Sequence, residues 1–162
     1  MFTLRCTKRL LERMRVEAAS DASSASTVLG NWYANLLYVA GSQIILAVSE
    51  RTLLPVLLPA AGAKKLPKRL PAAVGDVLAA VGIPAGAIER ELVEMRAVAV
   101  ATTANRHVLG SMNDFRVMLE FPQERGETLL ATALFLAETP CGPIRMESPR
   151  RATVAAFVES IH

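Results

Sequence analysis

Three residues of the types found in hydrolytic triads stand close together in the chain, at His107, Ser111 and Asp114. Their spacing of i, i+4 and i+7 places them in a row along one flank of a helix. A working triad needs a nucleophile, a base and an orienting acid that converge beside an oxyanion hole. The middle turns of a helix have no free N–H groups to form that hole. We therefore interpret the row as the polar flank of an amphipathic helix and predict no catalytic residue.

The same segment contains several residues that are unfavourable in a helix. Arg106 lies in the first turn, where the helix dipole disfavours a cation. Gly110 costs about 1 kcal/mol relative to Ala inside a helix, and Asn113 and Asp114 are poor helix formers. Such a concentration indicates a constraint from outside the segment, for example a ligand or backbone that approaches at Gly110. We take Arg106, Asn113 and Asp114 as candidate binding residues.

A structural explanation of these residues is also open. Arg106 would then pair with a carboxylate, and Asn113 would bond to a loop backbone, because buried polar groups more often fix packing than bind ligands.

A second candidate block opens the second predicted strand. Trp32 and Tyr33 alternate to opposite faces of that strand, so one ring can anchor the core while the other lines a groove. With Asn35 they complete the set of candidate binding residues. The alternative is that the aromatic residues serve only as a core anchor.

Motifs for metals and cofactors are missing from the sequence. It has no glycine-rich phosphate loop, zinc-ligand spacing or HExxH pattern, so we predict neither a metal nor a cofactor. Glu89, Glu91 and Glu94 are interpreted as a solvated helix face.

Basic residues gather in two segments, which are Arg5, Lys8, Arg9, Arg13 and Arg15, and then Lys64, Lys65, Lys68 and Arg69. Such clusters can bind phosphate groups. Neither segment has aromatic residues interleaved with the basic ones, as RNA-binding surfaces usually do. The sequence therefore argues against nucleic acid and favours a protein partner or a small anionic ligand.

Composition and length are those of one domain over residues 1–162, with 52% hydrophobic and 20% charged residues. The small and polar residues of 18–28 predict a mobile loop.

The most apolar region, 36–61, is interrupted by charged residues and by proline, so it cannot span a membrane. Cys6 and Cys141 belong to no motif, and two reduced thiols are typical of a cytoplasmic protein.

Apolar periodicity predicts both strands and helices. The strands are expected over 2–6, 31–39, 43–49, 52–58 and 97–101. The helices are expected over 8–16, 67–81, from Pro84 through the apolar repeat that ends at Met95, and over 105–121, 128–138 and 152–161. Short turns between residues 31 and 58 favour an antiparallel meander, in which Pro55 indicates that 52–58 is an edge strand or carries a bulge. We expect an α+β fold with an antiparallel or mixed sheet of about four to five strands, about five to six helices and a helical C-terminal part over 123–162.

Four blocks of the sequence resemble a family of uncharacterised prokaryotic proteins that is catalogued as a domain of unknown function. They are LRCTK at 4–8, LGNWYANL at 29–36, ERTLLP at 50–55 and NRHVLGSMNDF at 105–115. The resemblance implies kinship without an activity, so no catalytic residue is carried over. The family pattern usually has Ser where this chain has His107, which weakens any role of His107 as an essential base.

Two functions remain open. The first, which we prefer, is a non-catalytic binding domain with a groove between the Trp32/Tyr33 strand and the helix that carries Arg106 and Asn113. The second is a small enzyme for a phosphorylated or carboxylated substrate, with Arg106 as the anion clamp.

Overall fold

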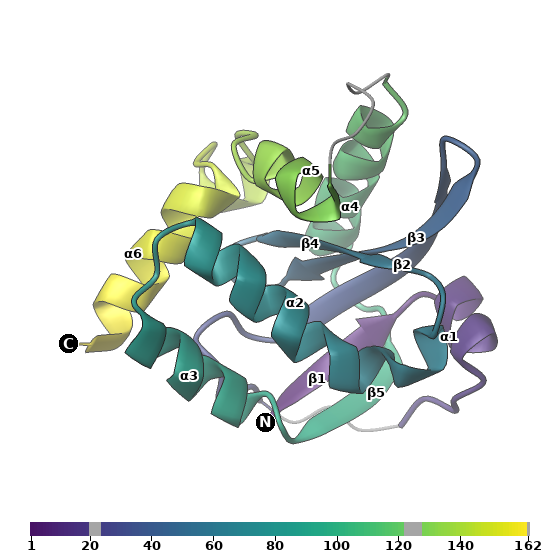
Figure 1. The fold of residues 1–162 in the computed structure, drawn as a ribbon, viewed down its shortest axis with the longest axis horizontal. Coiled ribbons are helices and arrows are strands. Elements are labelled where there is room, and N and C mark those ends of the chain that lie inside the picture. Colours follow the sequence, from purple (N-terminus) through teal and green to yellow (C-terminus); the bar gives the residue numbers. More distant parts are fainter. Residues whose placement is uncertain (20–23, 122–127, 162) are drawn as a thin grey trace.

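The fold is a five-stranded mixed sheet with helices on both faces (Figure 1). The structure is a computed structural model and describes residues 1–19, 24–121 and 128–161. The strands are β1 (Phe2–Cys6), β2 (Trp32–Val39), β3 (Ser42–Ser49), β4 (Pro55–Pro59) and β5 (Val98–Thr102). The helices are α1 (Lys8–Met14), α2 (Leu66–Ala80), α3 (Ala85–Glu94), α4 (Arg106–Leu119), α5 (Leu129–Leu136) and α6 (Pro149–Ile161), with short 3-10 turns η1 (Ala63–Lys65) and η2 (Gly142–Ile144). The predicted α+β fold is confirmed.

The strand order is β4-β3-β2-β1-β5. Strands β2, β3 and β4 form the predicted antiparallel meander, whereas β1 pairs in parallel with both β2 and β5. The β2–β3 hairpin closes through Ala40 and Gly41, whose φ angles of 50° and 81° suit a two-residue turn between twisted strands. Strand β4 lies at the edge of the sheet. Pro55 has no backbone N–H to donate, and an edge strand tolerates this because its outer side needs no hydrogen bond to a neighbouring strand.

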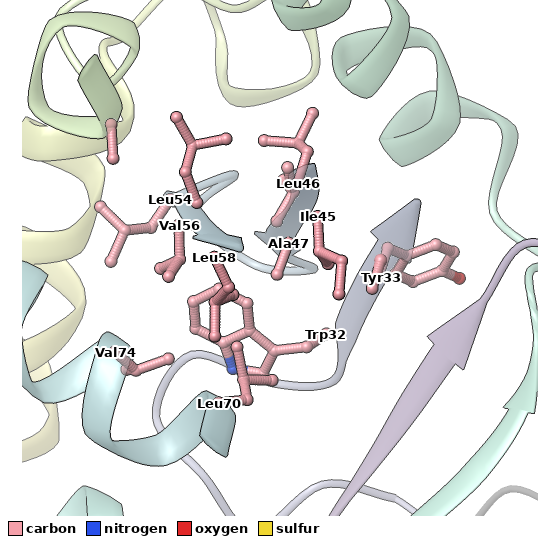
Figure 2. Close-up of a cluster of buried hydrophobic side chains, with 14 of the residues drawn as sticks. Trp32, Tyr33, Ile45, Leu46, Ala47, Leu54, Val56, Leu58, Leu70 and Val74 are labelled. Carbon is pink, nitrogen blue, oxygen red and sulfur yellow. The ribbon is translucent and has the colours of Figure 1, made fainter. Parts of the chain in front are cut away.

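Both faces of the sheet are covered. Trp32 lies on the same face as Leu70 and Val74 of α2 (Figure 2). The next residue, Tyr33, lies on the opposite face, where its hydroxyl accepts a hydrogen bond from the backbone N–H of Asn105 at 3.0 Å. Residues 45–48 of β3 are fully buried, as expected for a strand covered on two sides.

The segment that precedes β2 is only partly described. Residues 20–23 of the predicted mobile loop lie outside the described residues, so mobility over 18–28 stays a prediction. On either side of the gap the backbone is hydrogen-bonded, from Ala19 to Val100 at 2.8 Å and from Ser26 to Met1 at 2.9 Å. In the described parts of the chain, no helix has the length and apolar character needed to cross a membrane.

Candidate functional site

Helix α4 is attached to the sheet through its N-cap. The side chain of Asn105 accepts hydrogen bonds from the backbone N–H groups of His107 at 2.8 Å and Val108 at 3.4 Å. These bonds satisfy two of the N–H groups that the first turn of a helix leaves without partners. The backbone N–H of Asn105 donates in turn to Tyr33. The start of α4 is therefore held at a defined place above β2.

The predicted apolar stripe of α4 is confirmed. Val108, Met112, Phe115 and Leu119 are all buried, and α4 packs with them toward β2 and β3. Ser111 is buried beside this stripe, while His107 and Asp114 are exposed. The triad-like row is therefore divided between the interior and the surface, and the described residues show no hydrogen bond between its members.

The opposite side of α4 is the α4 outer face, which we define as Arg106, Gly110, Asn113 and Asp114. All four residues are exposed. A Cβ atom added at Gly110 would meet nothing within 4 Å. Among the described residues, no hydrogen bond or ion pair involves the side chain of Arg106, and Asn113 Oδ1 only accepts from Arg116 one turn later, at 3.1 Å from Nη2. The structural explanation, in which a carboxylate holds Arg106 and Asn113 holds a loop, finds no support in the described residues.

The candidate residues of β2 lie elsewhere. Trp32 is fully buried, and Tyr33 is 1% exposed. Asn35 is half-buried and accepts a hydrogen bond at 2.8 Å from Thr7, the residue between β1 and α1. We expected one aromatic ring to line a groove, but both rings lie in the core because the sheet is covered on each face. The structure therefore separates Trp32 from the α4 outer face by the thickness of the sheet.

A small cleft adjoins the first turn of α4. Its volume is about 270 Å³, and it is lined by Glu50, Arg51, Leu53, Asn105, His107, Val108, Pro143 and Ile144. Two of the four resemblance blocks, 50–55 and 105–115, meet here although they are far apart in the sequence. We did not single out residues 50–53 as site residues, and the ERTLLP block was the feature that could have identified them.

The charged residues of this cleft are already engaged. Arg51 donates from Nη1 to the backbone oxygens of Thr27 at 2.9 Å and Val28 at 3.3 Å. Glu50 accepts from the backbone N–H of Asn31 at 3.4 Å. His107 is exposed at the cleft, and no hydrogen bond to its ring is found within the described ranges. The cleft therefore contains one imidazole that has no hydrogen-bond partner among the described residues, next to an apolar wall.

Gly30 allows the 29–36 block to pack closely against the 50–55 block. Its φ of +79° is in the left-handed region, and a Cβ atom there would lie 2.9 Å from Cγ of Arg51. Backbone bonds join the same two blocks, from Glu50 to Asn31 at 2.8 Å and from Arg51 to Leu29 at 3.3 Å. The glycine at position 30 and the arginine at position 51 are thus explained by the packing of these two blocks.

Glu91 departs from the predicted solvated face. Its side chain is 2% exposed, and its carboxylate accepts from the backbone N–H groups of Val28 at 2.7 Å and Leu29 at 3.0 Å. Burial raises the pKa of Glu91, while the two backbone hydrogen bonds and the nearby Arg51 oppose that rise. Periodicity could not reveal this role, because the amides lie about 60 residues earlier in the chain.

A cavity with a volume of about 640 Å³ lies next to Glu91. It is lined by residues 26, 28, 86, 87, 89–91, 93, 94, 157 and 160, between α3 and α6. Both oxygens of the buried carboxylate already accept hydrogen bonds from the backbone. Glu91 therefore positions the 28–29 segment and is not available as an acid or base in this cavity.

Neither cysteine is an activated nucleophile. Burial raises the pKa of the Cys6 thiol to about 12. Burial also raises the pKa of Cys141, and the nearby carboxylate of Asp114 adds to that rise. Within the described ranges, His, Cys, Asp and Glu side chains form no group of three that could hold a metal ion.

The four resemblance blocks thus interlock around β1, β2, the 49–54 turn and the start of α4. A family model described as a domain of unknown function (DUF6933) matches residues 3–152. The chain belongs to this family. The match to DUF6933 includes the α4 outer face and the cleft, and it ends within α6. No curated protein and no solved structure shows significant similarity to this DUF6933 chain.

Proposed function

We propose that this chain is a non-catalytic binding domain whose partner contacts the α4 outer face. The observation that carries this proposal is the unexplained sequence of that face. Gly110 destabilises α4 by about 1 kcal/mol relative to Ala. No other part of the described structure lies within 4 Å of the place where its Cβ would stand, so packing within the chain does not require glycine there. Arg106 has no ionic partner among the described residues. Residues that weaken a helix without serving its own packing favour a contact made outside the chain.

The geometry supports a partner that lies along the first two turns of α4. Arg106, Gly110 and Asn113 are spaced by four and three residues, so they lie one above the other on the helix surface. Gly110 lets a backbone or a flat group approach closely between an Arg donor and an Asn side chain. An Arg guanidinium and an exposed amide are suited to backbone carbonyls and carboxylates. A protein segment with such groups is the partner that fits this face best.

The test compares the partners bound by wild type and by three variants, each expressed in the organism that the protein comes from. Arg106→Ala, Asn113→Ala and their combination should fold with an unchanged denaturation midpoint, because the side chains they remove are exposed. Tagged wild type and double variant are cross-linked in vivo at equal amounts, and the bound proteins are identified. We expect at least one partner to be recovered with the wild type and to be missing with the double variant.

Arg150→Ala in α6 serves as the matched control, because it removes an exposed arginine that is ion-paired with Glu138. It should retain the partner. Unfolding of the Arg106 or Asn113 variants, or recovery of the same proteins with all variants, would show that the α4 outer face is not a binding site.

A second candidate is an enzyme that acts on a phosphorylated or carboxylated substrate. It is favoured by one observation, the cleft of about 270 Å³ at the first turn of α4 with His107 in its wall. Arg106 is the neighbouring residue in that turn and does not itself line the cleft. Titration of labelled protein with inorganic phosphate or acetate, followed by NMR, should then shift the side-chain N–H signals of Arg106 and the ring signals of His107. Arg106→Lys should weaken the shift, because Lys cannot make the paired hydrogen bonds of a guanidinium. Absence of any shift would exclude this candidate.

The cytoplasm is the compartment we propose for either function. Cys6 and Cys141 are free and buried, and buried thiols without a disulfide partner suit a reducing environment.

A further inference from the structure

The two basic segments of the sequence lie side by side in the structure. Helix α1 contacts η1, at the end of the molecule where the β2–β3 hairpin projects (Figure 1). Arg13 donates to the Gln43 side chain at 3.2 Å, and the Gln43 backbone oxygen accepts from Ala60 at 3.3 Å. Arg69 donates to the neighbouring Ala61 oxygen at 2.6 Å. A continuous set of contacts therefore joins residues 8–15 to residues 64–69.

These contacts create one surface with a large excess of positive charge. We call the basic side chains of residues 8–15 and 64–69 the basic surface. Each of the two segments supplies four Lys or Arg residues, against the single acid Glu12. All of the basic side chains are exposed except Arg69, which is half-buried. The whole chain has a net charge of only +3, so the charge is strongly concentrated at this end.

The charge of the basic surface is not neutralised by neighbours. The ion pairs formed by the described residues involve the N-terminal amine, Arg116, Arg150 and Arg151, and none involves the basic surface. Grouping eight cations with a single acid is unfavourable through mutual repulsion. A polyanion that binds there would relieve the repulsion, and its binding is favoured further by the release of its counterions.

An exposed aromatic ring borders this surface. Tyr38 is 65% exposed and pairs across the hairpin with Gln43, the residue that accepts the hydrogen bond from Arg13. Directly opposed residues of an antiparallel pair project to the same face of the sheet. Tyr38 therefore projects on the side of α1. The basic segments contain no aromatic residue of their own, and the hairpin supplies one from a different part of the chain.

We propose that the basic surface binds single-stranded nucleic acid, with Lys and Arg on the phosphates and Tyr38 stacked on a base. Proteins that bind single strands without sequence preference combine a basic surface with aromatic side chains on which bases stack. RNA and DNA share both the phosphodiester backbone and the unstacked base, and a protein tells them apart mainly through the 2′-hydroxyl. This inference uses no residue of the α4 outer face and is independent of the function proposed above.

An anionic membrane fits the surface less well. Helices that lie in a membrane interface insert a face of large apolar side chains. In α1 the large apolar residues Leu10 and Met14 are fully buried, and Leu11 is half-buried and packs against the core. η1 buries Ala63. Among the exposed large apolar side chains of the described residues, Tyr38 is the one that the hairpin places at this charge, and one ring suits stacking on a base better than insertion among lipid chains.

Fluorescence anisotropy with labelled 20-nucleotide strands of RNA and of DNA tests the proposal. We expect saturable binding at low salt, with an affinity that falls steeply as salt increases. Lys64→Glu combined with Lys65→Glu should weaken binding at least about tenfold and reduce the slope of log K against log salt by about 0.7 for each phosphate that is no longer neutralised. Tyr38→Ala should weaken binding about fivefold or more, while Tyr38→Phe keeps the ring and the affinity.

Two further variants make the test specific. Lys8→Glu with Arg9→Glu probes the basic surface from the other segment and puts acids in the first turn of α1, where the helix dipole favours them. Arg90→Glu with Arg96→Glu in and after α3 changes the net charge equally at a distant place and should leave binding nearly unchanged. Circular dichroism melting should show that all variants fold.

Several results would overturn the proposal. One is that neither the RNA nor the DNA strand binds, and another is that the α3 control variant weakens binding as much as the variants of the basic surface do. The others are that duplex binds more tightly than single strands, and that phosphatidylserine vesicles bind while nucleic acid does not. Preference for RNA or for DNA would support it and identify the natural ligand.

Discussion

Two glycines show how differently the same residue type is used in this chain. Gly30 has a φ of +79° and lies against the Arg51 side chain, whereas Gly110 has ordinary helical geometry and open space where a Cβ would stand. The first is required by the fold. The second is unfavourable for the fold and belongs to the face that we propose as a binding site. Substitution by alanine should therefore have opposite effects at the two positions.

Gly110→Ala should raise the free energy of unfolding by about 1 kcal/mol, because it removes the entropic cost of glycine within α4 and creates no clash. Urea denaturation measures the change. If α4 binds a partner as proposed, the same variant should bind that partner more weakly while being more stable. A loss of stability would contradict the open surroundings described for Gly110.

Gly30→Ala should lower the free energy of unfolding by about 1–2 kcal/mol from the left-handed backbone alone. The added Cβ would also displace Arg51 from its bonds to the 27–28 backbone. Denaturation of this variant beside Arg51→Ala separates the two causes. If both variants lower the free energy of unfolding equally, the loss of the Arg51 contacts explains the whole effect of Gly30→Ala. If Gly30→Ala does not lower it at all, the geometry described for this turn is wrong.

Among the elements, α6 is attached to the rest of the molecule through a row of buried hydroxyls. Thr153 donates to Thr52 at 2.9 Å, Thr52 and Ser49 are 2.9 Å apart, and Ser49 accepts from the backbone N–H of Leu54 at 3.0 Å. Phe157 completes the buried side of α6, while Val154 and Val158 are exposed. The hydroxyl row connects α6 to the turn that forms one wall of the cleft.

Thr153→Val keeps the shape of the side chain and removes its hydroxyl, so it should cost about 1 kcal/mol, the net value of one hydrogen bond. The opposite change one residue later, Val154→Thr, is the matched control, and since position 154 is exposed it should alter stability by less than about 0.5 kcal/mol. Chemical denaturation compares the two. Hydrogen exchange should also become faster in α6 of the Thr153 variant than in α4. Equal stability of both variants would show that the hydroxyl row does not hold α6.

At the scale of the whole molecule, Glu91 connects α3 to the segment that leads into β2. A buried carboxylate with a raised pKa binds its proton more tightly in the folded chain than in the unfolded chain. Its contribution to stability is therefore fully present below the ordinary value of 4.5 and is lost as the pH rises through the raised pKa. Other carboxylates add their own pH dependence, so the comparison needs a variant that lacks only this titration.

Glu91→Gln provides that comparison. The free energy of unfolding of wild type minus that of Glu91→Gln should be largest below pH 4.5 and should decrease as the pH rises. Denaturation curves at several pH values measure the difference, with Glu89→Gln on the exposed side of α3 as the control. A difference that grows with pH would show that the two backbone hydrogen bonds and Arg51 outweigh the cost of burying the charge.

Most of the elements follow from local features of the sequence. The apolar periods of 67–81 and 105–121 predicted helices that the structure places at Leu66–Ala80 and Arg106–Leu119. Pro55 predicted an edge strand or a bulge, and β4 is at the edge. These predictions succeed because period, breakers and caps act within a few residues of each other.

The candidate site was only partly predictable. The exposed positions of Arg106, Asn113 and Asp114 follow from the helical period of α4, which the sequence contains. The burial of both Trp32 and Tyr33 does not, because alternation assigns the two rings to opposite faces without saying that each face is covered. Residues 50–53 entered the site only because the turn before β4 lies against the start of α4.

The sequence by itself determined which segments become strands and helices, approximately where they end, and which positions of α4 depart from good helix chemistry. Only the tertiary structure decided that β1 pairs in parallel with β2 and β5, that Glu91 is buried against amides from residues 28 and 29, and that the two basic segments meet beside Tyr38. The reason is physical. Local structure depends on neighbours along the chain, whereas pairing, burial and the clustering of charge depend on which distant segments share one core.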